Sequence, residues 1–179
     1  GITFFSAPTY LKSIDIMEEI DVPLYKLASA QIGTFPQLVE KVAATGKPVI
    51  LSTGIVTTNE LTKIVEIFKR NNNDKFIILH CNSIYPTPYD KVHLNIMDWY
   101  KNEFNCIVGF SDHTSDIYVP IAAVAMGAQV IEKHFALDRT LPVPDAPFSL
   151  EPNDFKRMVE GIRAAEQAII NGSREELQP

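Results

Sequence analysis

The chain has 179 residues, of which 46% are hydrophobic and 21% charged, a balance that suits one globular domain or part of a larger one. Sixteen Lys and Arg stand against 22 Asp and Glu, so the net charge is −6 and no basic stripe could follow a nucleic-acid backbone. No apolar run reaches the roughly 18 to 20 residues that a membrane-spanning helix needs, and no basic-then-apolar leader opens the sequence. We therefore expect a soluble, cytoplasmic protein that binds neither nucleic acid nor membrane.

Six short segments rich in Val, Ile and Phe alternate with helical patterns along the chain. These strand-like segments are 2–6, 24–28, 48–52, 76–81, 106–110 and 129–135. Parallel neighbouring strands need a crossover connection, which a helix supplies. The alternation therefore predicts a parallel sheet covered by helices.

Three helices carry clear boundary or face signals. Apolar residues between Phe155 and Ile169 recur on one stripe of a 3.6-residue period. Thr57, followed by Glu60 three residues later, is a capping box that predicts the start of another helix. Gly127 tolerates a positive φ angle and so predicts the end of a third.

Two architectures fit this alternation: an open doubly wound sheet, and a (β/α)8 barrel that lacks two units. No GxGxxG turn follows the first strand, which disfavours a dinucleotide-binding sheet. Polar residues stand at the C-terminal end of nearly every strand, as in TIM-type barrels, whereas an open sheet concentrates them at one switch point. We therefore expect six βα units of a TIM-type barrel over 1–170, followed by a tail or the start of a linker over 171–179.

In a barrel, all of these strand ends would meet at one mouth. They read FSAP, YKLAS, LSTG, HCNSIYP, GFSDHT and EKHF in chain order. A cation, small hydroxyls, an amide, two imidazoles and carboxylates would then surround one pocket.

The segments YKLAS, GKPVILSTG, HCNSIYPTP, GFSDHT, VIEKHF and LPVPDAPFSLEP, in this order, resemble the N-acetylneuraminate synthase family, which includes synthases of related nonulosonic acids. The resemblance covers about 4–170. It implies a metal-dependent condensation of phosphoenolpyruvate with an N-acetylated amino-sugar aldehyde similar to N-acetylmannosamine. In that reaction C3 of phosphoenolpyruvate attacks the aldehyde, water adds at C2, and phosphate leaves with cleavage of a C–O bond.

Members of that family carry two further βα units ahead of the matching segment and commonly an antifreeze-like domain behind it. The resemblance therefore implies that this chain holds units 3 to 8, as a fragment of a homodimeric protein. An incomplete barrel would leave unpaired strand edges, so we expect the isolated chain to associate or partly unfold and to show little or no turnover.

A metal site is expected at His113 and His134, because they stand at the ends of adjacent strands. Imidazole nitrogens suit a divalent transition metal that keeps open positions for substrate, and Mn²⁺ or Mg²⁺ fits an oxygen-rich substrate. Glu132 and His134 are two residues apart on a strand and so share a face. The metal would act as a Lewis acid on the sugar aldehyde.

Phosphoenolpyruvate carries dense negative charge, so its pocket needs a fixed cation and several short donors. The candidates, which the resemblance also assigns to this ligand, are Lys26, Ser29, Ser52, Asn82, Ser83 and Ser111. The family often has a threonine or serine where Ala7 stands, so one donor on the phosphate side is absent. An inward-facing Lys26 at a barrel mouth would need a counter-anion.

Three residues are candidates for catalytic and sugar-binding roles: Glu132, chosen for its place beside His134, and Asp145 and Tyr85, to which the resemblance assigns contacts with the sugar. Glu132 would position the attacking water or move its proton. Asp145, in the loop 141–145, would meet sugar hydroxyls at the catalytic centre, with Tyr85 near the same substrate. Asp112 could orient His113 or cap a helix, and Lys133, of opposite strand parity to Glu132, should point away from the pocket.

The remaining histidines and the two cysteines are expected to be structural. His80 should make a hydrogen bond at a strand end, and His93 should lie in a solvated loop. Cys81 and Cys106 lie in apolar strands without CxxC spacing, so we expect two thiols rather than a disulfide.

Two other classes of function remain open. A class I aldolase would use Lys26 as a Schiff-base lysine but would have no use for the histidine pair. A non-catalytic barrel remnant would keep folded βα units without turnover. The sequence does not choose among N-acetylmannosamine, its phosphate and diacetamido sugars as substrates.

Overall fold

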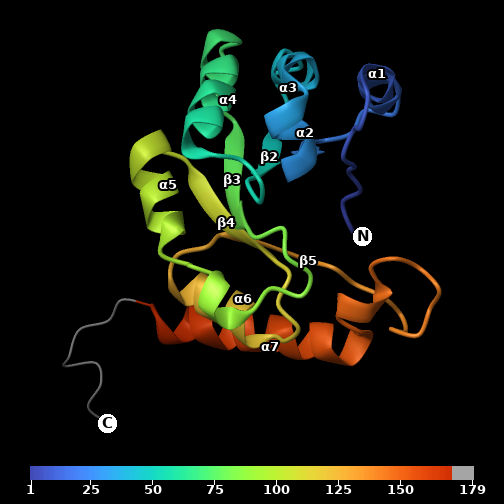
Figure 1. Ribbon diagram of the computed structural model, residues 1–179, viewed down its shortest axis with the longest axis vertical. Coiled ribbons are helices and arrows are strands. Elements are labelled where there is room, and N and C mark those ends of the chain that lie inside the picture. Colours follow the sequence, from blue (N-terminus) through green and yellow to red (C-terminus); the bar gives the residue numbers. More distant parts are fainter. Residues whose placement is uncertain (171–179) are drawn as a thin grey trace.

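The computed structural model describes residues 1–170, and its centre is one sheet of five parallel strands (Figure 1). The strands are β1 (Tyr25–Leu27), β2 (Val49–Ser52), β3 (Phe76–Cys81), β4 (Ile107–Asp112) and β5 (Val130–Lys133). They lie side by side in chain order, and each pairs in parallel with the next. The predicted parallel α/β organisation is confirmed.

Helices precede β1, connect each pair of consecutive strands and follow β5, and they lie around the outside of the sheet (Figure 1). They are α1 (Leu11–Glu19), α2 (Ser29–Thr34), α3 (Pro36–Ala43), α4 (Thr58–Arg70), α5 (Ile96–Phe104), α6 (Tyr118–Ala125) and α7 (Pro152–Ala168), with short 3₁₀ helices η1 (Tyr89–Lys91) and η2 (Ala146–Phe148). Figure 1 shows α1, α3, α4 and α5 following one another around the strands, while α6 and α7 pack together near β5. Within 1–170, no helix combines the length and apolar character needed to cross a bilayer.

The predicted helix boundaries match the structure. Thr57 caps α4: its Oγ1 accepts from Glu60 N at 3.3 Å, and its own N–H donates to Glu60 Oε2 at 2.8 Å. Gly127, with φ of +98°, follows the end of α6. Met158 and Ile162, one turn apart, bury the apolar face of α7.

The main core lies between the outer face of the sheet and the helices. Tyr25, Leu27, Leu51, Ile78 and Phe110 point outward from their strands and are at most 1% exposed. Removing an aliphatic or aromatic side chain of this size from water contributes roughly 1.5–3 kcal/mol. This layer fixes the strands, so their carboxyl ends form a rigid edge.

Residues 1–170 contain five strands rather than the expected six. The segment 2–6 forms no strand; Ser6 makes a single parallel bridge with Tyr25, and Lys26 N donates to Ser6 O at 3.2 Å. Ile2 is 101% exposed and Phe4 68%, so this segment has one neighbouring strand and little covering it. The expected tail, 171–179, lies outside the described residues.

The sheet is strongly curved. In a flat sheet, the four strand spacings between β1 and β5 would separate these edges by about 19 Å. Yet Lys26 Nζ of β1 lies 2.5 Å from Glu132 Oε2 of β5. The five strands therefore form an arc, a half-barrel, with Lys26 and Glu132 on its concave face.

Candidate functional site

The candidate site lies where the five strands end, on the concave side of the arc. Neighbouring strands in register point their paired side chains to the same side, and Ser111 pairs with Glu132 across β4 and β5. Lys26 reaches the same place from β1. Groups more than 100 residues apart in the sequence thus meet at one edge of the sheet.

Glu132 is the centre of a polar group of three residues. Its Oε2 accepts from Lys26 Nζ at 2.5 Å, and its Oε1 accepts from Ser111 Oγ at 2.7 Å. The side chain of Lys26 is 13% exposed and that of Glu132 is 38% exposed. The counter-anion that an inward lysine requires is therefore Glu132.

The ionised form of Glu132 is favoured by its neighbours. Burial alone would raise the pKa of this carboxyl, but the Lys26 ammonium and the Ser111 hydroxyl together hold it below its ordinary value. At neutral pH, Glu132 is therefore a carboxylate and an acceptor of protons and hydrogen bonds.

The two candidate metal ligands lie next to each other. The ring centroids of His113 and His134 are 5.3 Å apart. His113 Nδ1 lies 2.6 Å from Asn82 O, and because a carbonyl can only accept, this nitrogen must carry the proton. The lone pair of His113 is then on Nε2, the nitrogen free to bind a metal.

The charge state of His113 also suits metal binding. Burial lowers its pKa, outweighing the hydrogen bond to Asn82, so the neutral ring is favoured. His134 Nδ1 lies 3.5 Å from Asp145 Oδ2. Among residues 1–170, no group of three or more His, Cys, Asp or Glu side chains is placed to hold an ion. The imidazole pair fits a divalent metal whose other positions are filled from outside this set.

Aromatic rings enclose the imidazole pair. The ring of Tyr85 is 4.2 Å from that of His113, and Phe148 lies 5.1 Å from Tyr85 and 5.4 Å from His134. Partial burial raises the pKa of Tyr85, so its hydroxyl keeps its proton and can donate. The sequence interpretation missed Phe148, although it stands three residues after Asp145 in a motif already selected.

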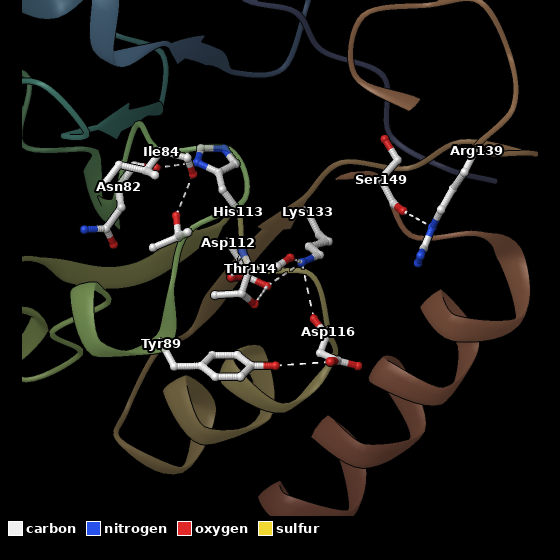
Figure 2. Close-up of polar contacts among 11 residues, drawn as sticks. Asn82, Ile84, Tyr89, Asp112, His113, Thr114, Asp116, Lys133, Arg139 and Ser149 are labelled. Carbon is white, nitrogen blue, oxygen red and sulfur yellow. Dashed lines mark hydrogen bonds and ion pairs between the residues drawn. The ribbon is translucent and has the colours of Figure 1, made fainter. Parts of the chain in front are cut away.

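The loop that carries Asp145 is tied down at its base. Leu150 N donates to His134 O at 2.9 Å, and Arg139 Nε donates to Ser149 O at 2.8 Å (Figure 2). The side chain of Asp145 is 61% exposed and reaches toward His134. This exposed carboxylate is placed to meet a ligand at the imidazole pair.

The small polar residues that are expected to bind phosphoenolpyruvate differ in the hydrogen bonds that they already make. Ser29 Oγ and Ser83 Oγ lie 3.4 Å apart, and Ser52 Oγ is buried with no hydrogen-bond partner in the described part of the chain. Asn82 Nδ2 instead donates to Lys91 O at 2.9 Å, so its donor is already engaged.

Gly54 leaves room for the side chains of Ser29 and Ser83 to lie close together. A Cβ at this position would lie 2.3 Å from Ser83 Oγ, 3.0 Å from Cys81 Sγ and 3.3 Å from Ser29 Oγ. The absence of a side chain therefore keeps this corner of the site open.

Lys133 points away from the concave face, as its strand parity predicted, and pairs with Asp112 at 2.6 Å (Figure 2). The carboxylate of Asp112 makes neither of the two expected direct contacts. The hydrogen bond of the His113 ring goes to Asn82 O rather than to Asp112, and the N-cap of α6 is Ile117. The carboxylate of Asp112 is instead paired with the ammonium group of Lys133.

The other histidines and the cysteines lie where structural roles would put them. His80 is buried, with Nε2 2.5 Å from Val92 O, and His93 is in an exposed turn. Both cysteines are free thiols. Burial raises the pKa of Cys81 and raises that of Cys106 to about 11, so neither is a thiolate at neutral pH.

The chain is similar to proteins of one family along nearly its whole length. The model of the NeuB family matches residues 1–174. An uncharacterized protein of Methanocaldococcus jannaschii is 47% identical over 174 residues, 97% of this chain and 51% of that protein. The pseudaminic acid synthase of Campylobacter jejuni is 42% identical over 172 residues, 96% of this chain and 50% of the synthase. The N,N'-diacetyllegionaminic acid synthase of Campylobacter jejuni is 38% identical over 174 residues, 96% of this chain and 52% of the synthase.

Solved structures show the same architecture. An N-acetylneuraminic acid synthetase of Leptospira borgpetersenii, in complex with citrate, is 35% identical with a TM-score of 0.91, over 99% of this chain and 61% of that one. A truncated 3-deoxy-D-arabino-heptulosonate 7-phosphate synthase of Thermotoga maritima, at 18% identity and a TM-score of 0.81, covers 94% of this chain and 67% of that one and shares the fold alone. The half-barrel therefore has TIM-barrel-like neighbours.

The chain spans about half the length of the relatives it matches. The family model nevertheless matches residues 1–174 of the 179. The expected relationship to the sialic acid synthases is confirmed, and the chain belongs to the NeuB family.

Proposed function

We propose that this chain provides the strand-end site of an enzyme that joins phosphoenolpyruvate to an N-acetylated amino-sugar aldehyde, giving a sialic or related nonulosonic acid and phosphate. The observation that carries the proposal is the meeting of Lys26, Glu132, His113 and His134 at one edge of the sheet. The relatives support it, because pseudaminic, diacetyllegionaminic and N-acetylneuraminic acid synthases all make products of one chemical class.

Phosphoenolpyruvate would bind on the β1 side of the site. Lys26 offers the fixed positive charge, and Ser52 offers a buried hydroxyl with no protein partner among the described residues. Ser29, Ser83 and Ser111 would add short donors, and Asn82 would join them only by releasing Lys91 O. The ammonium of Lys26 would then interact with two anions, the Glu132 carboxylate and the bound ligand.

A divalent metal, Mn²⁺ or Mg²⁺, would be held by His113 and His134. When bound there, such an ion supplies Lewis acidity to the aldehyde oxygen of the sugar. The protein's part would be to bring the two imidazoles close together and to leave a ring nitrogen free for the ion. The Asn82 carbonyl does this for His113 by fixing the proton on Nδ1.

Glu132 would position the water that adds at C2 and accept its proton. It is suited to this because Lys26 and Ser111 keep it ionised despite its burial. Asp145 and Tyr85 would meet the sugar, the first with an exposed carboxylate and the second with a protonated hydroxyl. The proposal includes the homodimer that the family resemblance implies and the cytoplasmic location that the bulk properties of the sequence predict.

A Schiff-base aldolase is the less favoured alternative. Such an enzyme presents a free lysine amine to a carbonyl carbon. The amine of Lys26 is instead held in an ion pair with Glu132, and the imidazole pair would have no task. A catalytically silent remnant would fold but give no product with any sugar.

The test is product analysis with two forms of the protein. One is the 179-residue chain, and the other is a chimera in which this chain replaces the matching half of the Campylobacter jejuni pseudaminic acid synthase. Each is mixed with phosphoenolpyruvate, Mn²⁺ and a panel of N-acetylmannosamine, its 6-phosphate and diacetamido sugars. We expect the chimera to release phosphate and form a nonulosonic acid with at least one sugar. A folded chimera that leaves phosphoenolpyruvate unchanged with every sugar would contradict the proposal.

A further inference from the structure

A buried ion pair joins the last two register partners of β4 and β5. Asp112 and Lys133 are register partners at the ends of these strands, with Nζ 2.6 Å from Oδ2 and side chains 0% and 1% exposed. Each directly precedes one member of the imidazole pair, His113 or His134. Since strand side chains alternate between faces, the ion pair points outward while the site is on the concave side.

Lys133 ties together the loop that leaves β4. Its ammonium donates to Asp112 Oδ2, to Thr114 O and, at 3.3 Å, to Asp116 O (Figure 2). Asp112 in turn accepts from Thr114 N at 2.9 Å and from Thr114 Oγ1 at 3.1 Å. All three donors of the ammonium are therefore used: two act on Asp112 and Thr114, which flank His113, and the third acts on Asp116, further along the loop.

His113 is also fixed from its other side. Its carbonyl accepts from Thr87 N at 2.8 Å, and its ring nitrogen Nδ1 lies 2.6 Å from Asn82 O. The segment after β3 thus holds the ring, while Lys133 on β5 holds the backbone around it. His134 directly follows Lys133 in the sequence. Lys133 is therefore connected to His134 through the backbone and to the residues around His113 through its ammonium group.

Stability alone does not account for this pair. Burying two charges is costly, and a buried ion pair can often be replaced by apolar residues of similar shape without loss of stability. An apolar replacement here would, however, leave Thr114 O and Asp116 O without the ammonium that they share. What only the charged pair provides is a defined geometry for the loop.

We propose that Asp112 and Lys133 are positioning residues that set the spacing and orientation of His113 and His134 without touching a ligand. The inference rests on the proposed metal site, and it makes the pair a determinant of metal affinity. The sequence interpretation treated Lys133 as structural and offered Asp112 as a residue that orients the His113 ring directly; here both act through the loop that carries His113.

The test uses the purified 179-residue chain with Lys133→Met, Asp112→Asn and the double variant. The double variant leaves no lone buried charge, so it should fold even if a single variant does not. Mn²⁺ binding is measured by calorimetry, and the His113 ring nitrogens are observed by NMR without metal. We expect the Kd for Mn²⁺ to rise by about 10- to 100-fold, as is typical when partners of metal ligands are lost. The single Nδ1–H tautomer of His113 should give way to a mixture.

A core variant serves as the control for destabilisation. Val42→Ala removes buried volume in α3, away from the site, and should lower the Tm without changing Mn²⁺ affinity or the His113 tautomer. Unchanged affinity and tautomer in the double variant would overturn the inference. If the unaltered chain bound no Mn²⁺, the metal proposal would fail separately, and the NMR result would still decide whether the pair positions the ring.

Discussion

Lys26 and Glu132 join the two edge strands of the sheet across its concave face, with Nζ 2.5 Å from Oε2. This one contact supplies the counter-anion of a lysine, keeps a carboxylate ionised and requires the sheet to curve. It also separates two roles, because Lys26 would bind a substrate while Glu132 would act on water.

Lys26→Ala should weaken phosphoenolpyruvate binding much more than sugar binding, because it removes the fixed cation on the β1 side. In the chimera, the KM for phosphoenolpyruvate should rise at least tenfold, while that for the sugar changes little. Lys63→Ala, on the exposed face of α4, is the control. Equal loss for both substrates, or none, would mean that Lys26 is scaffolding.

Glu132→Gln should lower kcat by about 10²- to 10⁴-fold, the usual contribution of a proton-transferring side chain. The amide keeps the shape and the hydrogen bond from Ser111 but cannot take a proton. The measurement is steady-state kinetics of the chimera. The control is Glu160→Gln, because Glu160 lies on the exposed face of α7. A normal kcat in Glu132→Gln would mean that another group positions the attacking water.

Acid should remove the stabilising effect of Glu132. Its pKa is lower in the folded chain than when unfolded, so ionised Glu132 stabilises the fold above the ordinary glutamate pKa, about 4.3. This contribution is lost as the pH falls through the lowered folded value. The difference in Tm between the unaltered chain and Glu132→Gln should therefore be largest near neutral pH and shrink in acid. A difference that grew in acid would mean that the carboxyl is held protonated.

Gly54→Ala should impair phosphoenolpyruvate binding, since its methyl group would lie 2.3 Å from Ser83 Oγ. The serine would have to move, and the corner formed with Ser29 would close. Gly33→Ala is a matched control, because its methyl group would make only an ordinary contact at 3.6 Å with Val56. We expect a raised KM for phosphoenolpyruvate in the first variant alone; equal behaviour of the two would remove Gly54 from the site.

Local patterns were enough to predict many elements. The Thr57 capping box, Gly127 and the apolar stripe of α7 depend on residues within one or two turns, and each lies where the sequence placed it. The segment 2–6 has the composition of a strand but forms only one bridge, because a strand needs neighbours and burial that composition does not supply.

The contacts within the site were harder to predict. Strand parity correctly sent Lys133 outward, but the partner of Lys26 is 106 residues away and depends on the curvature of the whole sheet. Asp112 was expected beside the His113 ring or at a helix start, and a buried ammonium from the next strand takes its carboxylate instead. Phe148 reaches the imidazole pair only because its loop folds back over β5.

The most direct test of the central claim is metal-dependent synthesis by the chimera. After treatment with a chelator, we expect no product from phosphoenolpyruvate and an amino-sugar, and full recovery when Mn²⁺ is added. His113→Ala and His134→Ala should each abolish that recovery, and borohydride should trap no lysine adduct. Product formation that survives chelation and both histidine substitutions, or a borohydride adduct at Lys26, would contradict the account.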